Sequence, residues 1–97
     1  MRVWVAADAA ALRNLKDGSP LVAERVAAES EDEAHEHEAM LAAAEAGPVV
    51  VVAELDDDAE LTVDLVQALH VDADGSGELA WYATQEIDEV VALLERS

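Results

Sequence analysis

Oxygen-bearing side chains in the segment 72–83 follow the spacing of the first half of a calcium-binding loop. Asp72, Asp74 and Ser76 stand at positions 1, 3 and 5 of such a loop, and a glycine follows at position 6. Calcium takes about six to eight oxygen ligands, and a bidentate Glu at the last loop position normally supplies two of them. That position is Ala83 in this chain, so we predict a hairpin loop that holds no metal.

The tripeptide His35-Glu36-His37 offers two imidazoles and a carboxylate. On a helix, side chains two residues apart point about 200° apart, so these histidines cannot chelate one ion. A metalloprotease helix needs a His-Glu-x-x-His motif. The zinc deaminase pattern needs a later pair of cysteines, and this chain contains none. We predict a solvated or half-buried helix face here, with neither a metal nor another cofactor.

Polar and aromatic residues near the C-terminus are the candidate binding residues. His70 and Asp72 are two apart in a predicted strand and share a face, as in a buried histidine with an acidic partner or a pH-sensitive contact. Gln85 and Glu86 follow a strand and begin a helix, where they either cap that helix or contribute to a site. The candidate set is His70, Asp72, Trp81, Tyr82, Gln85 and Glu86.

No catalytic constellation accompanies these candidates. We expect Trp81 and Tyr82 to pack at the core and its rim rather than to stack on a ligand. None of the serines stands in a nucleophile elbow, and no glycine-rich loop opens a helix after a strand. With 23 acidic residues, close carboxylate pairs are expected by chance. We therefore predict no catalytic residue.

The charge balance constrains the partners of this protein. Twenty-three acidic residues against five basic ones give a formal net charge of −18. Such a surface repels a phosphate backbone or an anionic membrane, so we expect neither as a direct partner. The acids occur in almost every segment, which favours a salt-adapted, halophilic-type surface. Two alternatives would also explain the acidic charge: the surface binds a basic protein, or it imitates nucleic acid.

Composition and length indicate one globular domain spanning residues 1–97. Apolar residues make up 53% of the chain, which excludes a disordered acidic tail. Without cysteine, no disulfide forms. The N-terminus starts as a strand rather than a signal peptide, and no apolar run approaches the roughly 20 residues that cross a membrane. The expected location is the cytoplasm.

The clearest local signal is a capping box at the start of an acidic helix over 30–46. Ser30 takes the N-cap position and Glu33 follows three residues later. Gly47 and Pro48 end the helix. Its predicted inner stripe is Ala34, His37, Leu41 and Ala44, with Met40 beside it.

The remaining apolar segments predict a sheet and two further helices. Strands are expected at 2–7, 21–28, 49–53, 69–72 and 79–83. Helices are expected at 9–16, capped by Asp8, and from Thr84 onward. The segment 58–69 carries leucines at helical spacing and also β-branched residues, so helix and strand both stay open there.

These elements predict an α+β domain. Its mixed sheet has four or five strands, with two to three helices packed on it and the valine run 49–53 in the centre. A ferredoxin-like split βαβ arrangement is the alternative.

The C-terminal third resembles a family of small uncharacterised proteins found mainly in actinobacteria. The resemblance rests on His70-Val71-Asp72 and on the block Trp-Tyr-Ala-Thr-Gln-Glu-Ile at 81–87. The opening strand, the acidic helix and the valine strand are more weakly similar, and the chain is shorter before the acidic helix. The family has no established activity, so the resemblance implies an α+β domain of unknown function.

We expect a non-enzymatic binding or regulatory module. Its expected partners are a second copy of the chain or a basic protein. One alternative is a small enzyme that uses Glu86 with His70 or Asp72. The other is an acidic mimic of nucleic acid that inhibits a basic protein.

Overall fold

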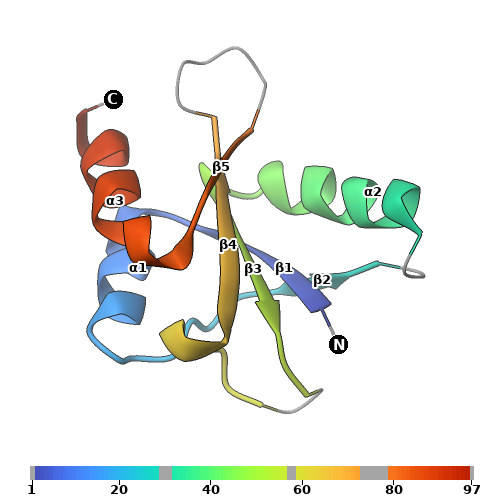
Figure 1. Cartoon of the computed structure of the whole chain (residues 1–97), viewed down its shortest axis with the longest axis horizontal. Coiled ribbons are helices and arrows are strands. Elements are labelled where there is room, and N and C mark those ends of the chain that lie inside the picture. Colours follow the sequence, from blue (N-terminus) through green and yellow to red (C-terminus); the bar gives the residue numbers. More distant parts are fainter. Residues whose placement is uncertain (1, 29–31, 57–58, 73–78, 97) are drawn as a thin grey trace.

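The computed structural model describes residues 2–28, 32–56, 59–72 and 79–96. These segments form β1 (Arg2–Ala7), α1 (Ala9–Lys16), β2 (Arg25–Ala27), α2 (Glu33–Ala44), β3 (Val49–Glu54), the 3₁₀ helix η1 (Val63–Leu65), β4 (Val66–Val71), β5 (Ala80–Tyr82), the 3₁₀ helix η2 (Thr84–Glu86) and α3 (Ile87–Arg96) (Figure 1). Five strands and three α-helices confirm the predicted α+β class and the predicted order of elements.

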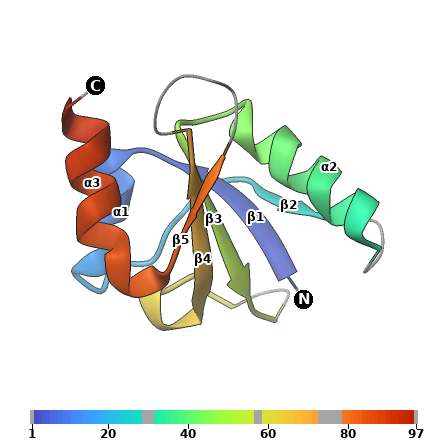
Figure 2. The same cartoon turned by 45° about the horizontal axis from the view of Figure 1, so that its top comes forward.

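The strands form one sheet in the order β2-β1-β3-β4-β5, so β3 lies in its centre as predicted. All pairs of neighbouring strands in this sheet are antiparallel, which corrects the expected mixed sheet. A continuous apolar run is typical of parallel strands because helices cover both faces of such sheets. Here helices cover both faces of an antiparallel sheet, and the valine run of β3 arises for the same reason (Figure 2).

The segment 21–28 contributes less strand than predicted. Only Arg25–Ala27 pairs with β1, and Leu21 forms an isolated bridge in which its N–H donates to the Leu61 carbonyl at 2.8 Å. β1 and β2 are direct antiparallel neighbours. β3 lies on the other side of β1 and is also antiparallel to it, so β2 and β3 are parallel to each other and α2 joins them as a split βαβ unit. The split βαβ part of the alternative is therefore present, but the full ferredoxin-like arrangement is wrong, because helices lie on both faces of the sheet instead of one.

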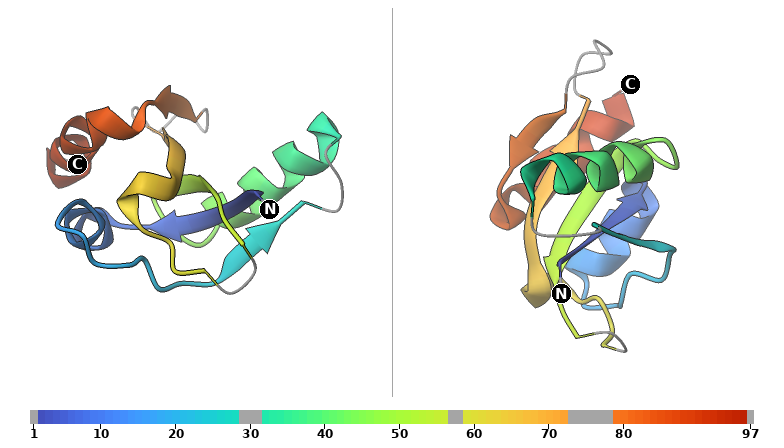
Figure 3. Two further views of the ribbon diagram at one scale, coloured as in Figure 1. Left: turned by 60° about the horizontal axis from the view of Figure 1, so that its bottom comes forward. Right: turned by 90° about the vertical axis from the view of Figure 1, so that its right-hand side faces the viewer.

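Helices α1 and α3 pack side by side on one face of the sheet, and α2 lies on the other (Figure 3). The predicted cap of α1 is confirmed, because the Asp8 side chain accepts a hydrogen bond from the Ala11 N–H at 2.8 Å. Leu12 and Leu15 are fully buried, as their spacing predicted. The core on this face also includes Val3, Val5, Val49, Val51, Leu69, Val71, Ile87, Val90 and Val91.

Two ion pairs join α1 to α3 at the surface. Arg13 pairs with Glu95, and Lys16 pairs with Asp88. The hydrogen bond from Arg13 lowers the pKa of the Glu95 carboxyl. All four side chains are about half exposed or more, so these pairs contribute little to stability.

Helix α2 packs on β2, β1 and β3. Its buried side chains are Ala39 and Ala43, whereas Leu41 is 46% exposed. The predicted inner stripe is therefore wrong at Ala34, His37 and Leu41, which are exposed, whereas Ala44 and the adjacent Met40 pack against this core as predicted. Short alanine side chains let the helix lie close to the sheet beside the buried Trp4, and a leucine there would hold it further away.

The N-cap of α2 is Asp32, whose side chain accepts a hydrogen bond from the Ala34 N–H at 2.9 Å. Ser30 lies outside the described residues, so the predicted capping box does too. Glu33 is the first residue of the helix instead of its third, and the helix ends at Ala44, slightly earlier than predicted.

The segment left open at 58–69 contains both kinds of structure in its described part. The 3₁₀ helix η1 leads directly into β4, which begins at Val66 and pairs with β5 as the predicted hairpin. Residues 73–78, which hold most of the calcium-like positions, lie outside the described residues. No helix in the described segments is long and apolar enough to span a bilayer.

Candidate functional site

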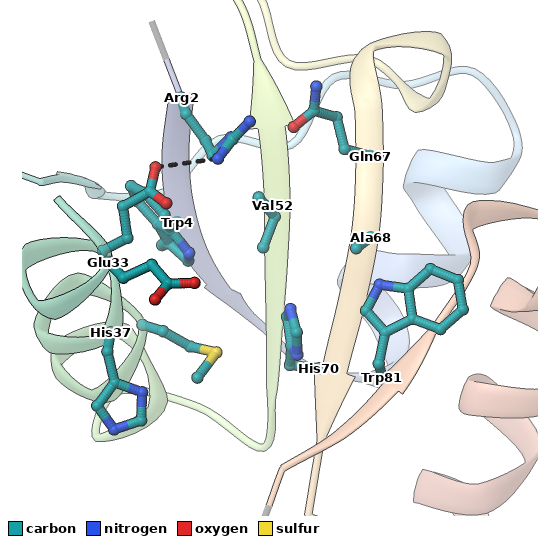
Figure 4. A pocket seen from close by; sticks show the side chains of 11 residues that line it. Arg2, Trp4, Glu33, His37, Val52, Gln67, Ala68, His70 and Trp81 are labelled. Carbon is teal, nitrogen blue, oxygen red and sulfur yellow. Dashed lines mark hydrogen bonds and ion pairs between the residues drawn. The ribbon is translucent and has the colours of Figure 1, made fainter. Parts of the chain in front are cut away.

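A groove with a volume of about 530 Å³ lies on the α2 face of the sheet. Helix α2 packs on β2, β1 and β3, and the groove continues over β4 and β5. Side chains of α2 form one wall and Trp81 of β5 stands on the other side, with Val52, Ala68 and His70 between them (Figure 4).

The floor of the groove is set by an irregularity in β4. Val52 of β3 faces Ala68, but the next residue of β3 faces Val66, so β4 contains one extra residue, Gln67. This shift resembles a β-bulge, which re-aims neighbouring side chains. Ala68 and His70 consequently face the groove, while Gln67 is exposed at its edge.

Trp81 is the most exposed aromatic side chain among the described residues, at 61%. It stands on the edge strand β5, directly opposite His70 of β4. Trp4, from β1, is 4% exposed and closes the groove beneath α2. The groove therefore has one buried and one open indole.

The wall formed by α2 is acidic. Glu33, Glu36, His37 and Met40 line it. Arg2 donates to the Glu36 carboxylate at 2.9 Å, and its Nε lies 3.7 Å from Glu54. Among the residues that the structure describes, Glu33 makes no hydrogen bond or ion pair. One carboxylate of the wall is thus neutralised and the other is available.

His70 is the titratable group at the floor. Burial lowers the pKa of its imidazole because the charged form loses hydration. Within the described part of the chain it has no hydrogen-bond or ion-pair partner. Its side chain is therefore neutral at pH 7 and offers one nitrogen as donor and one as acceptor.

The predicted candidates are only partly brought together. His70 and Trp81 line the groove. Tyr82 packs against the core on the opposite face of the sheet. Asp72 follows the end of β4 and does not line the groove.

The remaining two candidates act near the start of the last helix. The Glu86 carboxylate accepts a hydrogen bond from the Ala83 N–H at 2.9 Å, which is the capping role weighed for it. Gln85 is exposed beside it and does not line the groove. The groove therefore lacks the carboxylate that an acid–base pair of His70 with Glu86 or Asp72 requires.

Several groove residues were not predicted, chiefly Arg2, Glu33, Met40 and Gln67. The two-residue period of β1 does place Arg2 and Trp4 on one face. No local sequence pattern indicates which helix covers that face of the sheet or how far the helix extends over it. The groove could therefore not be predicted from the sequence.

The lining offers apolar surface and one carboxylate as contacts for a ligand. In the described segments, no group of three or more His, Asp or Glu side chains is arranged to hold a metal ion. The groove offers aromatic and apolar contact at Trp81, Met40 and Val52, and a carboxylate acceptor at Glu33. This combination suits a ligand with an apolar stem and a positive charge.

No protein-family model matches this chain, and no curated protein or solved structure matches it either. The resemblance to small actinobacterial proteins stays a prediction.

Proposed function

We propose that this protein is a non-enzymatic binding module that docks a basic protein segment in the groove between α2 and β5. The observation that carries the proposal is the exposed Trp81 standing across an apolar floor from an acidic helix wall. Contiguous apolar surface with a polar rim is typical of interaction sites, whereas a single exposed apolar side chain is not.

Charge complementarity selects the class of partner. The chain carries a net charge of −18, and the groove adds Glu33 and Glu36 against the single cation Arg2. A basic partner is attracted over a distance set by the ionic strength, which raises its association rate. A second copy of the same chain is repelled, so a homodimer through this groove is the less favoured occupant.

The other function classes have weaker support. An enzyme that combines His70 with Glu86 or Asp72 is disfavoured because neither carboxylate lines the groove. A mimic of nucleic acid needs an ordered array of acids and has no need of Trp81. A cytoplasmic location and a salt-adapted surface remain part of the proposal, since both agree with the acidic composition.

A peptide-display selection on the purified chain tests the proposal. We expect the enriched peptides to contain Lys or Arg next to apolar residues, and to bind at least tenfold more weakly in 1 M KCl than at 50 mM. Trp81→Ser should reduce their binding. Leu41→Ser is the matched control, because Leu41 is also an exposed apolar residue of the α2 layer but does not line the groove.

Selected peptides that bind the Trp81→Ser and wild-type chains equally would place the binding surface elsewhere. Enrichment of neutral or acidic peptides would reject a basic partner. Sedimentation of the free chain tests whether a second copy of the chain occupies the groove instead. A wild-type dimer that becomes a monomer in Trp81→Ser would show that it does.

A further inference from the structure

We propose that the groove releases its basic partner when His37 and His70 become protonated. This inference rests on the proposed function and names the regulation of the same groove. The two imidazoles line the groove from different elements, His37 from α2 and His70 from β4 (Figure 4). Histidine ordinarily changes charge between pH 5 and 8, whereas the lysines and arginines of a partner stay charged throughout that range. Any change in attraction over that range therefore originates in the groove.

Protonation of the two histidines reverses the charge of the groove lining. With neutral imidazoles, the lining holds two carboxylates, Glu33 and Glu36, against one guanidinium, that of Arg2. Two imidazolium groups turn this excess of one negative charge into an excess of one positive charge. Charges around one groove act on a ligand within it, because the Debye length is about 10 Å at 0.1 M ionic strength. A basic segment that is attracted at neutral pH is therefore repelled by the groove at lower pH.

His37 also competes with the partner for a carboxylate. It stands four residues after Glu33 on α2, and both side chains line the groove. Side chains at this spacing are neighbours on a helix surface, and an acid that precedes a base is the favourable order for an ion pair. Neither side chain makes a hydrogen bond or ion pair within the described segments. A protonated His37 therefore pairs with Glu33 and removes the acceptor that a basic partner needs.

His70 acts from the floor, where no carboxylate among the described residues pairs with it. Burial lowers the pKa of its imidazole, so it becomes charged at a lower pH than an ordinary histidine. Its opposite residues on the two neighbouring strands are Val50 and Trp81, which carry no charge. Asp72 follows the end of β4 and does not line the groove. A proton on His70 therefore adds an uncompensated positive charge beneath the ligand.

The other charged groups beside α2 do not cancel this effect. Arg2 donates to Glu36 at 2.9 Å, and its Nε lies 3.7 Å from Glu54 of β3. The side chains that β2 and the residue after it pack against this layer are Val26 and Ala28, which are uncharged. Carboxylates and guanidinium groups ordinarily keep their charge between pH 7.5 and pH 5.5. The two histidines therefore account for the change in charge of the lining over this range.

Two blocked hexapeptides form the probe set. One alternates lysine with leucine, and the other has glutamine in place of each lysine. Isothermal titration calorimetry in 50 mM KCl gives the dissociation constants at pH 7.5 and pH 5.5. The measured quantity is the ratio of these two constants, because a substitution that changes binding equally at both pH values leaves the ratio unchanged. The glutamine peptide should show no pH-dependent ratio, since it carries no charge for the groove to repel.

We expect wild type to bind the lysine peptide about three- to tenfold more weakly at pH 5.5 than at pH 7.5. The double variant His37→Gln/His70→Gln should reduce this ratio to below about twofold, and each single variant should give an intermediate ratio. In a Glu33→Gln background, His37→Gln should change the ratio less than it does in wild type, because the ion pair is already lost. His35→Gln is the matched control, since His35 lies on the same helix but does not line the groove.

The outcomes separate this inference from the proposed function. If the lysine peptide requires Trp81 at pH 7.5 but wild type and the double variant give the same ratio, the inference fails and the binding module stands. If His35→Gln lowers the ratio as much as His37→Gln, the overall charge acts and not the groove, which also overturns the inference. If neither the lysine peptide nor any display-selected peptide depends on Trp81, both fail.

Folding of the variants is checked by circular dichroism at both pH values. His37 is exposed, so we expect His37→Gln to fold as wild type does. This single variant tests the inference even if the replacement of the half-buried His70 disturbs the fold. An unchanged ratio in a folded His37→Gln would contradict the role of the pair with Glu33.

Discussion

Trp81 stands directly opposite His70 in the β4–β5 pair, and both side chains line the groove beside α2. Residues opposite each other in an antiparallel pair have Cβ atoms about 4.5–5.5 Å apart, so the two side chains are neighbours on the groove face. We therefore expect the exposed indole to shield one side of the half-buried imidazole.

This shielding can be measured through the imidazole itself. Burial lowers the pKa of His70, and Trp81→Ala removes part of that burial. We expect the pKa of His70 to rise toward its ordinary value in Trp81→Ala, and to stay unchanged in Leu41→Ser. NMR titration of the imidazole signals measures both. An unchanged pKa in Trp81→Ala would mean that other groups desolvate His70.

His70 also links stability to pH. Its pKa is lowered in the folded chain from an ordinary value of 6.5, so below neutral pH the unfolded chain binds more protons and stability falls. His70→Gln serves as the reference because it contains the same carboxylates as wild type, so their contribution to the pH dependence cancels in the comparison. We expect the free energy of unfolding of wild type, relative to His70→Gln, to decrease between pH 7.5 and pH 5. Urea unfolding at both pH values gives this difference, and a constant difference would contradict the assignment.

The packing of α2 predicts which residues of this helix tolerate change. Ala43 is 2% exposed against the sheet, and Leu41 is 46% exposed. Ala43→Leu should cost about 1–3 kcal/mol of stability because the larger side chain overpacks the contact. Leu41→Ala should stay within about 0.5 kcal/mol. Thermal or urea unfolding compares them, and the reverse ranking would restore the stripe predicted from the sequence.

The cap of α1 makes a further stability prediction. Asp8 accepts a hydrogen bond from the Ala11 N–H, and replacing such a cap by alanine costs about 1 kcal/mol. Asp8→Ala should show that loss in urea unfolding. Asp17→Ala, at the other end of the same helix, also removes one negative charge and serves as the control. If Asp8→Ala and Asp17→Ala changed the free energy of unfolding equally, the change in net charge and not the loss of the cap would be the cause.

Salt should stabilise the free chain. The net charge is −18, and the Debye length falls from about 10 Å at 0.1 M to about 3 Å at 1 M ionic strength. Added KCl screens the repulsion far more than it weakens the exposed pairs such as Arg13–Glu95. We expect the melting temperature to rise by several degrees between 0.1 and 1 M KCl. A falling curve would argue against a salt-adapted surface.

Local signals in the sequence predicted most of the fold. The cap at Asp8, the leucine spacing of α1 and the valine run of β3 each act through neighbouring residues, and the structure confirms all three. The direction of strand pairing was not predictable in this way. A buried strand is apolar on both faces whether its neighbours run parallel or antiparallel, so the valines carry no information about direction.

The helix α2 and the groove required longer-range information. Alanines occur all round α2, so the helix sequence alone does not indicate which face packs against the sheet beside Trp4 of a distant strand. His70 and Trp81 could be named as candidates from their types. Whether they line one groove together with Glu33 depends on how far α2 extends over the sheet. That extent depends on the packing of several segments and cannot be predicted from any one of them.

The unequal covering of the two faces makes this scaffold a good starting point for altered specificity. On the α1–α3 side, fully buried side chains such as Leu12 and Leu69 tie each position to its neighbours. On the α2 side, Gln67 and His70 project from β4, which pairs with β3, and Trp81 projects from β5, which pairs with β4. Substitutions at these three positions can therefore be combined and selected for new ligands while the fold is maintained by the opposite layer.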